Sequence, residues 1–273
     1  MTSTPTPMHV LDVVRVDGDL LRVSVSGEGR PLLLIMGLGG NIEMWDPLAR
    51  ALNRQQIQTI AYDAPGTGDS PTRLVPQRMP GLARQAAHLL DMLGHSHADV
   101  LGVSFGGAVA QELALGHPRR VRRMVLASTM CGVGGIPGNP VALSLLATPL
   151  RYYSPAFLRR TAKILYGPII SDENTLLRED ISAWRARPPT LWGYLGQLAA
   201  AAGWTSLPRL HRITAPTMII SGSADPIVPP VNARILARRI PSARLELIEG
   251  AGHLVLMDIA ERCATTIADF LDE

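Results

Sequence analysis

The sequence is poor in cysteine, lysine and aromatic residues, and each shortage argues against a class of protein. Two cysteines, Cys131 and Cys263, are too few for a disulfide framework and match no zinc-binding spacing. Lys163 is the only lysine, so the formal net charge of +3 comes almost entirely from arginine. Because aromatic residues make up 4% of the chain and none interleave with the basic cluster at 119–123, we expect no nucleic-acid partner.

The sequence also predicts neither a membrane-spanning segment nor a leader. Residues 124–150 and 188–207 carry no formal charge and are long enough to cross a bilayer. Prolines and glycines interrupt both stretches repeatedly, so neither predicts a transmembrane helix. Residues 1–10 show no basic segment followed by an apolar one, so we expect no signal peptide and a cytoplasmic location.

Apolar residues are abundant, at 47% of the 273 residues against 18% charged residues, which is enough for a large core. Short aliphatic runs alternate with helical periodicity, a pattern typical of βα units around a mainly parallel sheet. The predicted strands cover residues 13–16, 21–25, 32–36, 59–63, 99–103, 124–127, 217–221 and 245–248. The predicted helices cover residues 82–93, 108–115, 231–239 and 259–271.

Residues 131–208 interrupt this alternation with eight prolines and several short helical patterns. We predict a core formed by residues 1–130 and 209–273, with residues 131–208 inserted after the sixth strand as a helical lid. Both charge-free stretches fall largely in this insertion. They either form an apolar mouth to a site, pack against the core, or dock on a hydrophobic surface.

A Gly-x-Ser-x-Gly motif, centred on Ser104, lies between a predicted strand and a predicted helix. In this context the motif is typical of a nucleophile elbow, a sharp turn that exposes a reactive serine. The glycines allow neighbouring backbone to pass close to the serine, and the helix amino terminus offers free N–H groups. Since the bare motif also arises by chance, an ordinary turn is the alternative interpretation.

A serine nucleophile needs a base to take its proton and an acid to orient that base. Where such an elbow occurs, the acid and then the histidine follow the serine along the chain, and only His253 follows a late predicted strand. Asp225 comes directly after the strand predicted at 217–221, at the edge where open α/β sheets carry active sites. We therefore predict a catalytic triad of Ser104, Asp225 and His253.

Two backbone N–H groups are predicted to stabilise the oxyanion that forms when the serine attacks a carbonyl. One belongs to Phe105 and the other to Leu38, in the glycine-rich segment 36–40. An ordinary glycine turn is the alternative for that segment. The residues expected to contact substrate are Gly37, Val103, Trp192 and Leu254.

Several stretches resemble the α/β-hydrolase superfamily, and more closely the intracellular depolymerases of medium-chain-length poly(3-hydroxyalkanoate). They are MGLGGNIE (36–43), PGLA (80–83), GVSFGG (102–107), LRYY (150–153), AGWTS (202–206) and RIPSA (239–243). The resemblance implies an α/β-hydrolase fold, with a mostly parallel eight-stranded sheet and helices on both faces, and it implies the same triad. The chain departs from those depolymerases at Phe105, where they have tryptophan, and at Met36, which replaces a polar residue.

These features together predict a serine-dependent carboxylic ester hydrolase that works through an acyl-enzyme, without a metal or organic cofactor. The expected substrate is an apolar ester, either a polyhydroxyalkanoate-type polyester or a medium-chain acyl ester, and a hydrophobic granule surface is a further expected partner. Other functions of this fold stay open: a small-ester esterase or lipase, a lactonase, a cofactor-free perhydrolase, or a non-catalytic ligand receptor.

Overall fold

The structure, a computed structural model, describes residues 9–169 and 187–273. Within these residues eight strands form one sheet in the order β1-β2-β4-β3-β5-β6-β7-β8. The strands are β1 (His9–Val16), β2 (Asp19–Ser26), β3 (Arg30–Ile35), β4 (Ile57–Tyr62), β5 (Ala98–Val103), β6 (Val121–Ala127), β7 (Thr217–Gly222) and β8 (Ala243–Ile248). Strand β2 runs antiparallel to β1 and β4, and every other pairing is parallel, which confirms the predicted mostly parallel sheet.

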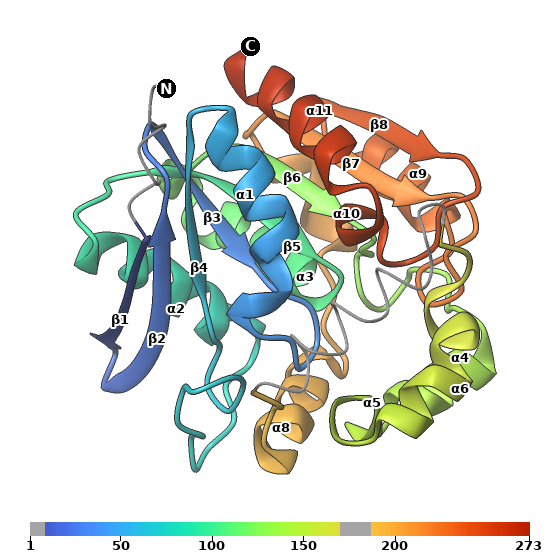
Figure 1. Cartoon of the computed structure of the whole chain (residues 1–273). Coiled ribbons are helices and arrows are strands. Elements are labelled where there is room, and N and C mark those ends of the chain that lie inside the picture. The colour runs from blue at the N-terminus through green and yellow to red at the C-terminus, as the bar shows by residue number, and fades with distance from the viewer. Residues whose placement is uncertain (1–8, 170–186) are drawn as a thin grey trace, which may run out of the picture.

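Helices cover both faces of the sheet, as predicted (Figure 1). The helices α1 (Asp46–Arg54) and α11 (Ala260–Asp272) pack on one face, and α2 (Met79–Met92), α3 (Phe105–Gly116) and α9 (Val231–Arg239) pack on the other. Alternate side chains of β3 pack on opposite faces of the sheet. Leu32 and Leu34 lie on the face covered by α1 and α11, and Leu33 and Ile35 lie on the face covered by α2, α3 and α9. Burial on both faces explains why this strand reads as one continuous aliphatic run.

Helix α1 was missed by the sequence analysis. Its buried apolar residues are Leu48, Ala51 and Leu52, and charged or polar side chains occupy four of its nine positions. A helix this short offers few repeats of the apolar spacing, although the proline at its amino terminus is a recognised start signal.

The described part of the segment between β6 and β7 contains several helices, in agreement with the predicted helical insertion after the sixth strand. The main helices are α4 (Pro140–Leu146), α5 (Leu150–Tyr153), α6 (Pro155–Tyr166) and α8 (Leu191–Ala201), and they gather at one end of the molecule (Figure 1). Side chains of Asn139, Ser154 and Thr190 accept hydrogen bonds from the first turns of α4, α6 and α8. These caps satisfy N–H groups that a helix leaves unpaired, so the local sequence sets where each helix begins.

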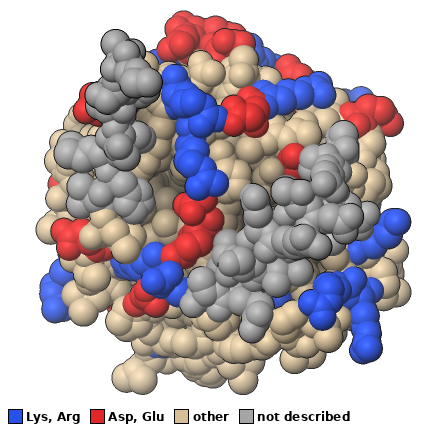
Figure 2. Space-filling model, in the orientation of Figure 1, with Lys and Arg blue, Asp and Glu red and all other residues tan. Residues whose placement is uncertain are grey.

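Three arginines of the basic cluster at residues 119–123 contact other side chains of the protein. Arg120 pairs with Asp91, Arg122 donates to Asp99 at 2.5 Å, and the Arg123 guanidinium lies over the ring of Phe270. On the face drawn in Figure 2, acidic and basic side chains lie interspersed. Among the described residues, no helix has both the length and the apolar character needed to cross a bilayer.

Glu112 joins the helix α3 to the end of the insertion, and we expect its charge to contribute to stability. Its carboxylate accepts from Arg209 at 3.1 and 2.9 Å and from the Trp204 indole at 2.8 Å, and it is 5% exposed. Burial raises the pKa of Glu112, but its hydrogen bonds to Arg209 and Trp204 outweigh this and hold the pKa below its ordinary value of 4.5. The stabilisation is therefore present above pH 4.5 and is lost as the pH falls through the folded-state pKa.

We predict that Glu112→Gln lowers the free energy of unfolding by about 1–3 kcal/mol at neutral pH. The difference from wild type should shrink below pH 4.5, measured by urea unfolding across a pH series. Glu261→Gln removes an exposed pair with Arg54 and serves as the control, with an expected cost of at most about 1 kcal/mol. If the two variants lowered the free energy of unfolding equally, the buried carboxylate of Glu112 would stabilise the protein no more than the exposed carboxylate of Glu261 does.

Candidate active site

Three side chains meet at the carboxyl ends of β5, β7 and β8. His253 Nδ1 lies 2.7 Å from Asp225 Oδ2, and His253 Nε2 lies 3.1 Å from Ser104 Oγ. The three residues thus form one hydrogen-bonded chain, although 149 positions separate Ser104 from His253. This is a geometry in which an imidazole, oriented by a carboxylate, can take a proton from a hydroxyl group.

The Asp225 carboxylate is held in place by the backbone of its own loop. Its Oδ1 atom accepts from the N–H groups of Ile227 and Val228, both at 2.9 Å. Its side chain is fully shielded from solvent, so Oδ2 is directed to His253 alone among the described residues. Burial and two backbone donors therefore fix the orientation of the carboxylate, which in turn orients the imidazole.

Ser104 adopts a backbone conformation that side chains rarely occupy, with φ 54° and ψ −117°. Such a conformation costs about 1–3 kcal/mol, so surrounding contacts must stabilise it. The Ser104 N–H donates to Ala127 O at 2.9 Å, and the Thr129 hydroxyl donates to Ser104 O at 2.7 Å. The strand β6 and the segment after it thus hold the turn that presents the Ser104 hydroxyl.

Glycines at the elbow allow main chains to touch. A Cβ atom at Gly106 would lie 2.0 Å from Ile35 O, and one at Gly102 would lie 2.4 Å from Gly106 O. Gly37, just after β3, lies against Ser104, because a Cβ there would be 3.4 Å from Ser104 Cβ. These close approaches bring the segment that contains Leu38 beside the elbow.

Residues 37–40 form a tight turn, as the glycine-rich sequence predicts. The Gly40 N–H donates to Gly37 O at 3.1 Å, and Gly39 has φ +74°, the value typical of the third residue of a type II turn. A Cβ at Gly39 would meet the rings of Tyr194 and Tyr152 at 2.7 and 2.8 Å. Within the described residues, the N–H groups of Leu38 and Phe105 have no hydrogen-bond partner and are free to bind a ligand.

A cavity of about 80 Å³ opens at Ser104 and His253, and apolar side chains dominate its lining. Four residues predicted from the sequence line it: Gly37, Leu38, Val103 and Leu254. The insertion and neighbouring loops add Met36, Gly40, Met44, Leu146, Arg151, Tyr152, Tyr166, Ile227 and Met257. An apolar chamber with few polar groups suits a ligand that is itself mostly apolar.

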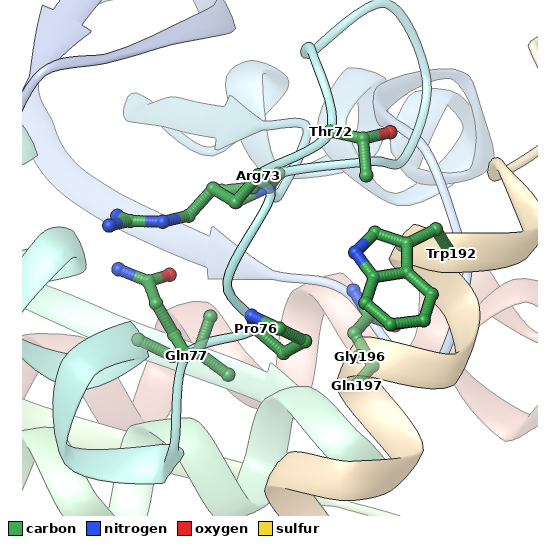
Figure 3. A pocket seen from close by; sticks show the side chains of 10 residues that line it. Thr72, Arg73, Pro76, Gln77, Trp192, Gly196 and Gln197 are labelled. Atoms are coloured by element: carbon green, nitrogen blue, oxygen red, sulfur yellow. The ribbon is translucent and has the colours of Figure 1, made fainter.

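Trp192, which the sequence analysis assigned to the substrate-binding surface, does not line this cavity. It projects from α8 and is 52% exposed. Figure 3 shows its indole beside Thr72 and Pro76 of the loop between β4 and α2, where it lines a separate, smaller depression. Its Nε1 atom donates to Leu74 O at 3.3 Å. The structure thus places Trp192 on the outer surface, apart from Ser104.

The insertion supplies polar groups that the sequence analysis did not assign to the site. Arg151 is 4% exposed, and no acidic residue pairs with it in the part of the chain that the structure describes. Burial lowers the pKa of Arg151, but its tyrosine neighbours, Tyr152, Tyr166 and Tyr194, together raise it above its ordinary value. Burial raises the pKa of Tyr194 to about 12, so the hydroxyl that Tyr194 presents to this cation is neutral at neutral pH.

Tyr166 ends α6 and links the insertion to the histidine. Its carbonyl oxygen accepts from the His253 N–H at 2.7 Å, and a Cβ atom at Gly252 would lie 1.9 Å from that oxygen. Among these tyrosines only Tyr152 had a sequence signal, because it is adjacent to Tyr153 in a chain with few aromatic residues.

No group of three or more potential metal ligands occurs among the residues that the structure describes.

Comparison with known proteins agrees with this architecture. Residues 32–266 match the alpha/beta hydrolase family, and the chain belongs to that family.

Several of its relatives are named as hydrolases or depolymerases. The chain is 39% identical to a poly(3-hydroxyalkanoate) depolymerase of Ectopseudomonas oleovorans, over 98% of this chain and 94% of that protein. It is 27% identical to 3-oxoadipate enol-lactonase 2 of Acinetobacter baylyi, over 90% of this chain and 91% of that protein. The crystal structure of a hydrolase from Pseudomonas aeruginosa covers 96% of this chain and 98% of its own, with a TM-score of 0.80 and 27% identity. The resemblance that the sequence predicted is confirmed.

We predict that Gly106→Ala destabilises the protein by about 3 kcal/mol, because its methyl group would overlap the backbone of β3. Thermal unfolding measures the change. Gly116→Ala is the matched control: the site lies at the other end of the same helix, and nothing lies within 4 Å of an added Cβ there. This control should be neutral or slightly stabilising, and a Gly106→Ala protein as stable as the control would contradict the packing argument.

Proposed function

We propose that this chain is a carboxylic ester hydrolase that cleaves an apolar ester through an acyl-enzyme on Ser104. The observation that carries the proposal is the hydrogen-bonded chain from Ser104 through His253 to Asp225, at 3.1 and 2.7 Å, beside a mostly apolar cavity. The depolymerase relative supports a polyhydroxyalkanoate-type polyester or a medium-chain acyl ester as substrate. In this proposal residues 131–208 act as a lid on the core formed by residues 1–130 and 209–273.

The first half-reaction forms the acyl-enzyme. His253 Nε2 takes the hydroxyl proton of Ser104 while Oγ attacks the ester carbonyl carbon, and Asp225 stabilises the imidazolium that results. The unpaired N–H groups of Leu38 and Phe105 bind the oxyanion. As the tetrahedral intermediate collapses, the bond to the alcohol oxygen breaks and the imidazolium gives its proton to that oxygen.

The second half-reaction releases the acid. The imidazole of His253 takes a proton from a water molecule, whose oxygen attacks the acyl carbon in the same oxyanion site. The bond to Ser104 Oγ then breaks, and Oγ regains its proton from the imidazolium. Each bond made or broken in this cycle involves only substrate, water and the three side chains, so the mechanism needs no cofactor.

We predict that Ser104→Ala lowers ester hydrolysis at least about a thousandfold, because the nucleophile is lost. The measurement uses p-nitrophenyl esters of increasing acyl length together with medium-chain polyester, short-chain polyester and triglyceride. A fluorophosphonate should label wild type at Ser104 and should not label the variant. Ser144→Ala, an exposed serine on α4, is the control and should keep wild-type rates. Turnover retained by Ser104→Ala would remove Ser104 from the nucleophile role, and labelling without turnover on any ester would favour a ligand receptor.

The proposal includes association with a hydrophobic polyester granule inside the cell. Four large apolar side chains are exposed on α8 and on the loop between β4 and α2: Leu74 (92%), Val75 (74%), Leu191 (58%) and Trp192 (52%). The hydrogen bond from Trp192 to Leu74 joins the two segments, and Figure 2 shows few charges along the lower edge, where α8 lies. An insoluble apolar polymer is the occupant that suits such a surface.

We predict that Leu74→Gln combined with Leu191→Gln weakens binding to polyester particles by about fivefold or more. Full burial of one leucine contributes about 1.5–3 kcal/mol, so partial burial of two leucines accounts for this factor. Co-sedimentation with amorphous polyester particles measures binding. Met92→Gln, at an exposed position on α2, is the control. Unchanged co-sedimentation of the double variant would exclude this surface as the docking site.

A further inference from the structure

The peptide that links Leu38 to Gly39 is held at both ends by side chains of the insertion. The Leu38 carbonyl oxygen accepts from the Tyr152 hydroxyl at 2.6 Å and from Arg151 at 2.9 Å. On the opposite side of the same peptide, the Gly39 N–H donates to Gln197 Oε1 at 2.7 Å. Arg151 and Tyr152 come from α5 and Gln197 comes from α8, so two separate helices of the insertion hold one peptide plane.

This peptide is the one whose orientation distinguishes turn types. Type I and type II turns share the closing hydrogen bond and differ mainly by rotation of the central peptide. Here the Gly40 N–H closes the turn onto Gly37 O, and φ +74° at Gly39 corresponds to the type II orientation. The peptide plane before Leu38 contains Gly37 O, so the closing hydrogen bond from Gly40 restrains that plane at one end while the side chains of the insertion fix the plane that follows. That preceding plane carries the Leu38 N–H.

Arg151 is costly to bury and is stabilised only by neutral groups among the described residues. Its guanidinium lies over the rings of Tyr152 and Tyr194, at 4.6 and 5.2 Å from their centroids, and donates to the Tyr194 hydroxyl at 2.5 Å. The Tyr194 hydroxyl in turn donates to Leu146 O at 2.6 Å. Removing a charge from water costs several kcal/mol, which tyrosine faces and carbonyl dipoles offset in part.

The position of this cation gives it an electrostatic role as well. Arg151 lines the cavity that contains Ser104 and His253. In an apolar chamber a fixed positive charge stabilises negative charge that develops nearby far more than it would in water. The same side chain therefore holds the turn and favours an anionic intermediate.

We propose that Arg151, Tyr152 and Gln197 are positioning residues that hold the turn at Gly37–Gly40 so that the Leu38 N–H meets the oxyanion. The inference rests on the proposed function, and it assigns to the insertion a part in catalysis beyond access to the site. The three side chains hold the turn without touching the reacting oxygen, and Arg151 adds the effect of its charge. The N–H groups of Leu38 and Phe105 bind that oxygen.

The decisive comparison is between two adjacent tyrosines of α5. Tyr152→Phe removes the hydroxyl that donates to Leu38 O, and Tyr153→Phe removes one that donates to Pro189 O on the outer side of the insertion. We expect Tyr152→Phe to lower kcat about 10-fold to 100-fold with KM changed by less than about twofold, since direct removal of an oxyanion donor costs about 100-fold to 1,000-fold. Tyr153→Phe should keep wild-type values.

A transition-state analogue separates positioning from simple loss of structure. An alkyl boronic acid forms a tetrahedral adduct with the serine, so its affinity should fall in Tyr152→Phe by the same factor as kcat/KM. Arg151→Lys should recover part of the activity that Arg151→Met loses, because an ammonium group can still donate to Leu38 O. All rates are expressed per active site counted by end-point fluorophosphonate labelling, which corrects for unfolded protein.

Each result bears on one hypothesis. Absence of labelling and turnover in wild type would refute the proposed function and leave the turn contacts as structure only. Normal labelling with equal kcat and boronate affinity in Tyr152→Phe and Tyr153→Phe would overturn the positioning role alone. A rise in KM restricted to esters that carry a free carboxylate, with kcat unchanged in Arg151→Met, would also overturn it and make Arg151 a substrate-binding group.

Discussion

The site depends on a reversal of the chain at Ser104, where β5 turns directly into α3. That reversal places Ser104 at positive φ and forces the helix against the end of β3, so Gly106 and Ile35 make backbone contact. The same contact brings the loop that follows β3 against Ser104. A conformation that costs free energy locally is maintained because the parallel strands β3, β5 and β6 surround it with hydrogen-bonded backbone.

The insertion between β6 and β7 supports the same site from the other side. Its α5 and α8 hold the turn that contains Leu38, and the end of α6 accepts the main-chain N–H of His253. The insertion therefore contacts both the proposed oxyanion site and the proposed base, so any displacement of the insertion would change the geometry of the site.

The strands and the three polar side chains of the candidate site could be predicted from the sequence, because each carries a local signal. Period-two and continuous apolar runs identify strands, the Gly-x-Ser-x-Gly turn identifies an elbow, and chain order singles out His253 and Asp225. It did not find α1, which is only nine residues long, and it set Trp192 at the substrate, where the structure shows an outward-facing side chain. Apolar composition in a segment indicates burial or contact, but it does not say which face of a helix turns toward the cavity.

Taken alone, the sequence determined the alternation of strands and helices, the sharp turn at Ser104 and the place of the helical insertion, because local backbone preferences and periodicity decide these features. Only the tertiary structure decided that Arg151, Tyr152 and Gln197 meet the peptide between Leu38 and Gly39. These partners are 113 to 158 positions apart in the chain. Contacts of that range depend on how the insertion packs on the core, and no local pattern of residues encodes that packing.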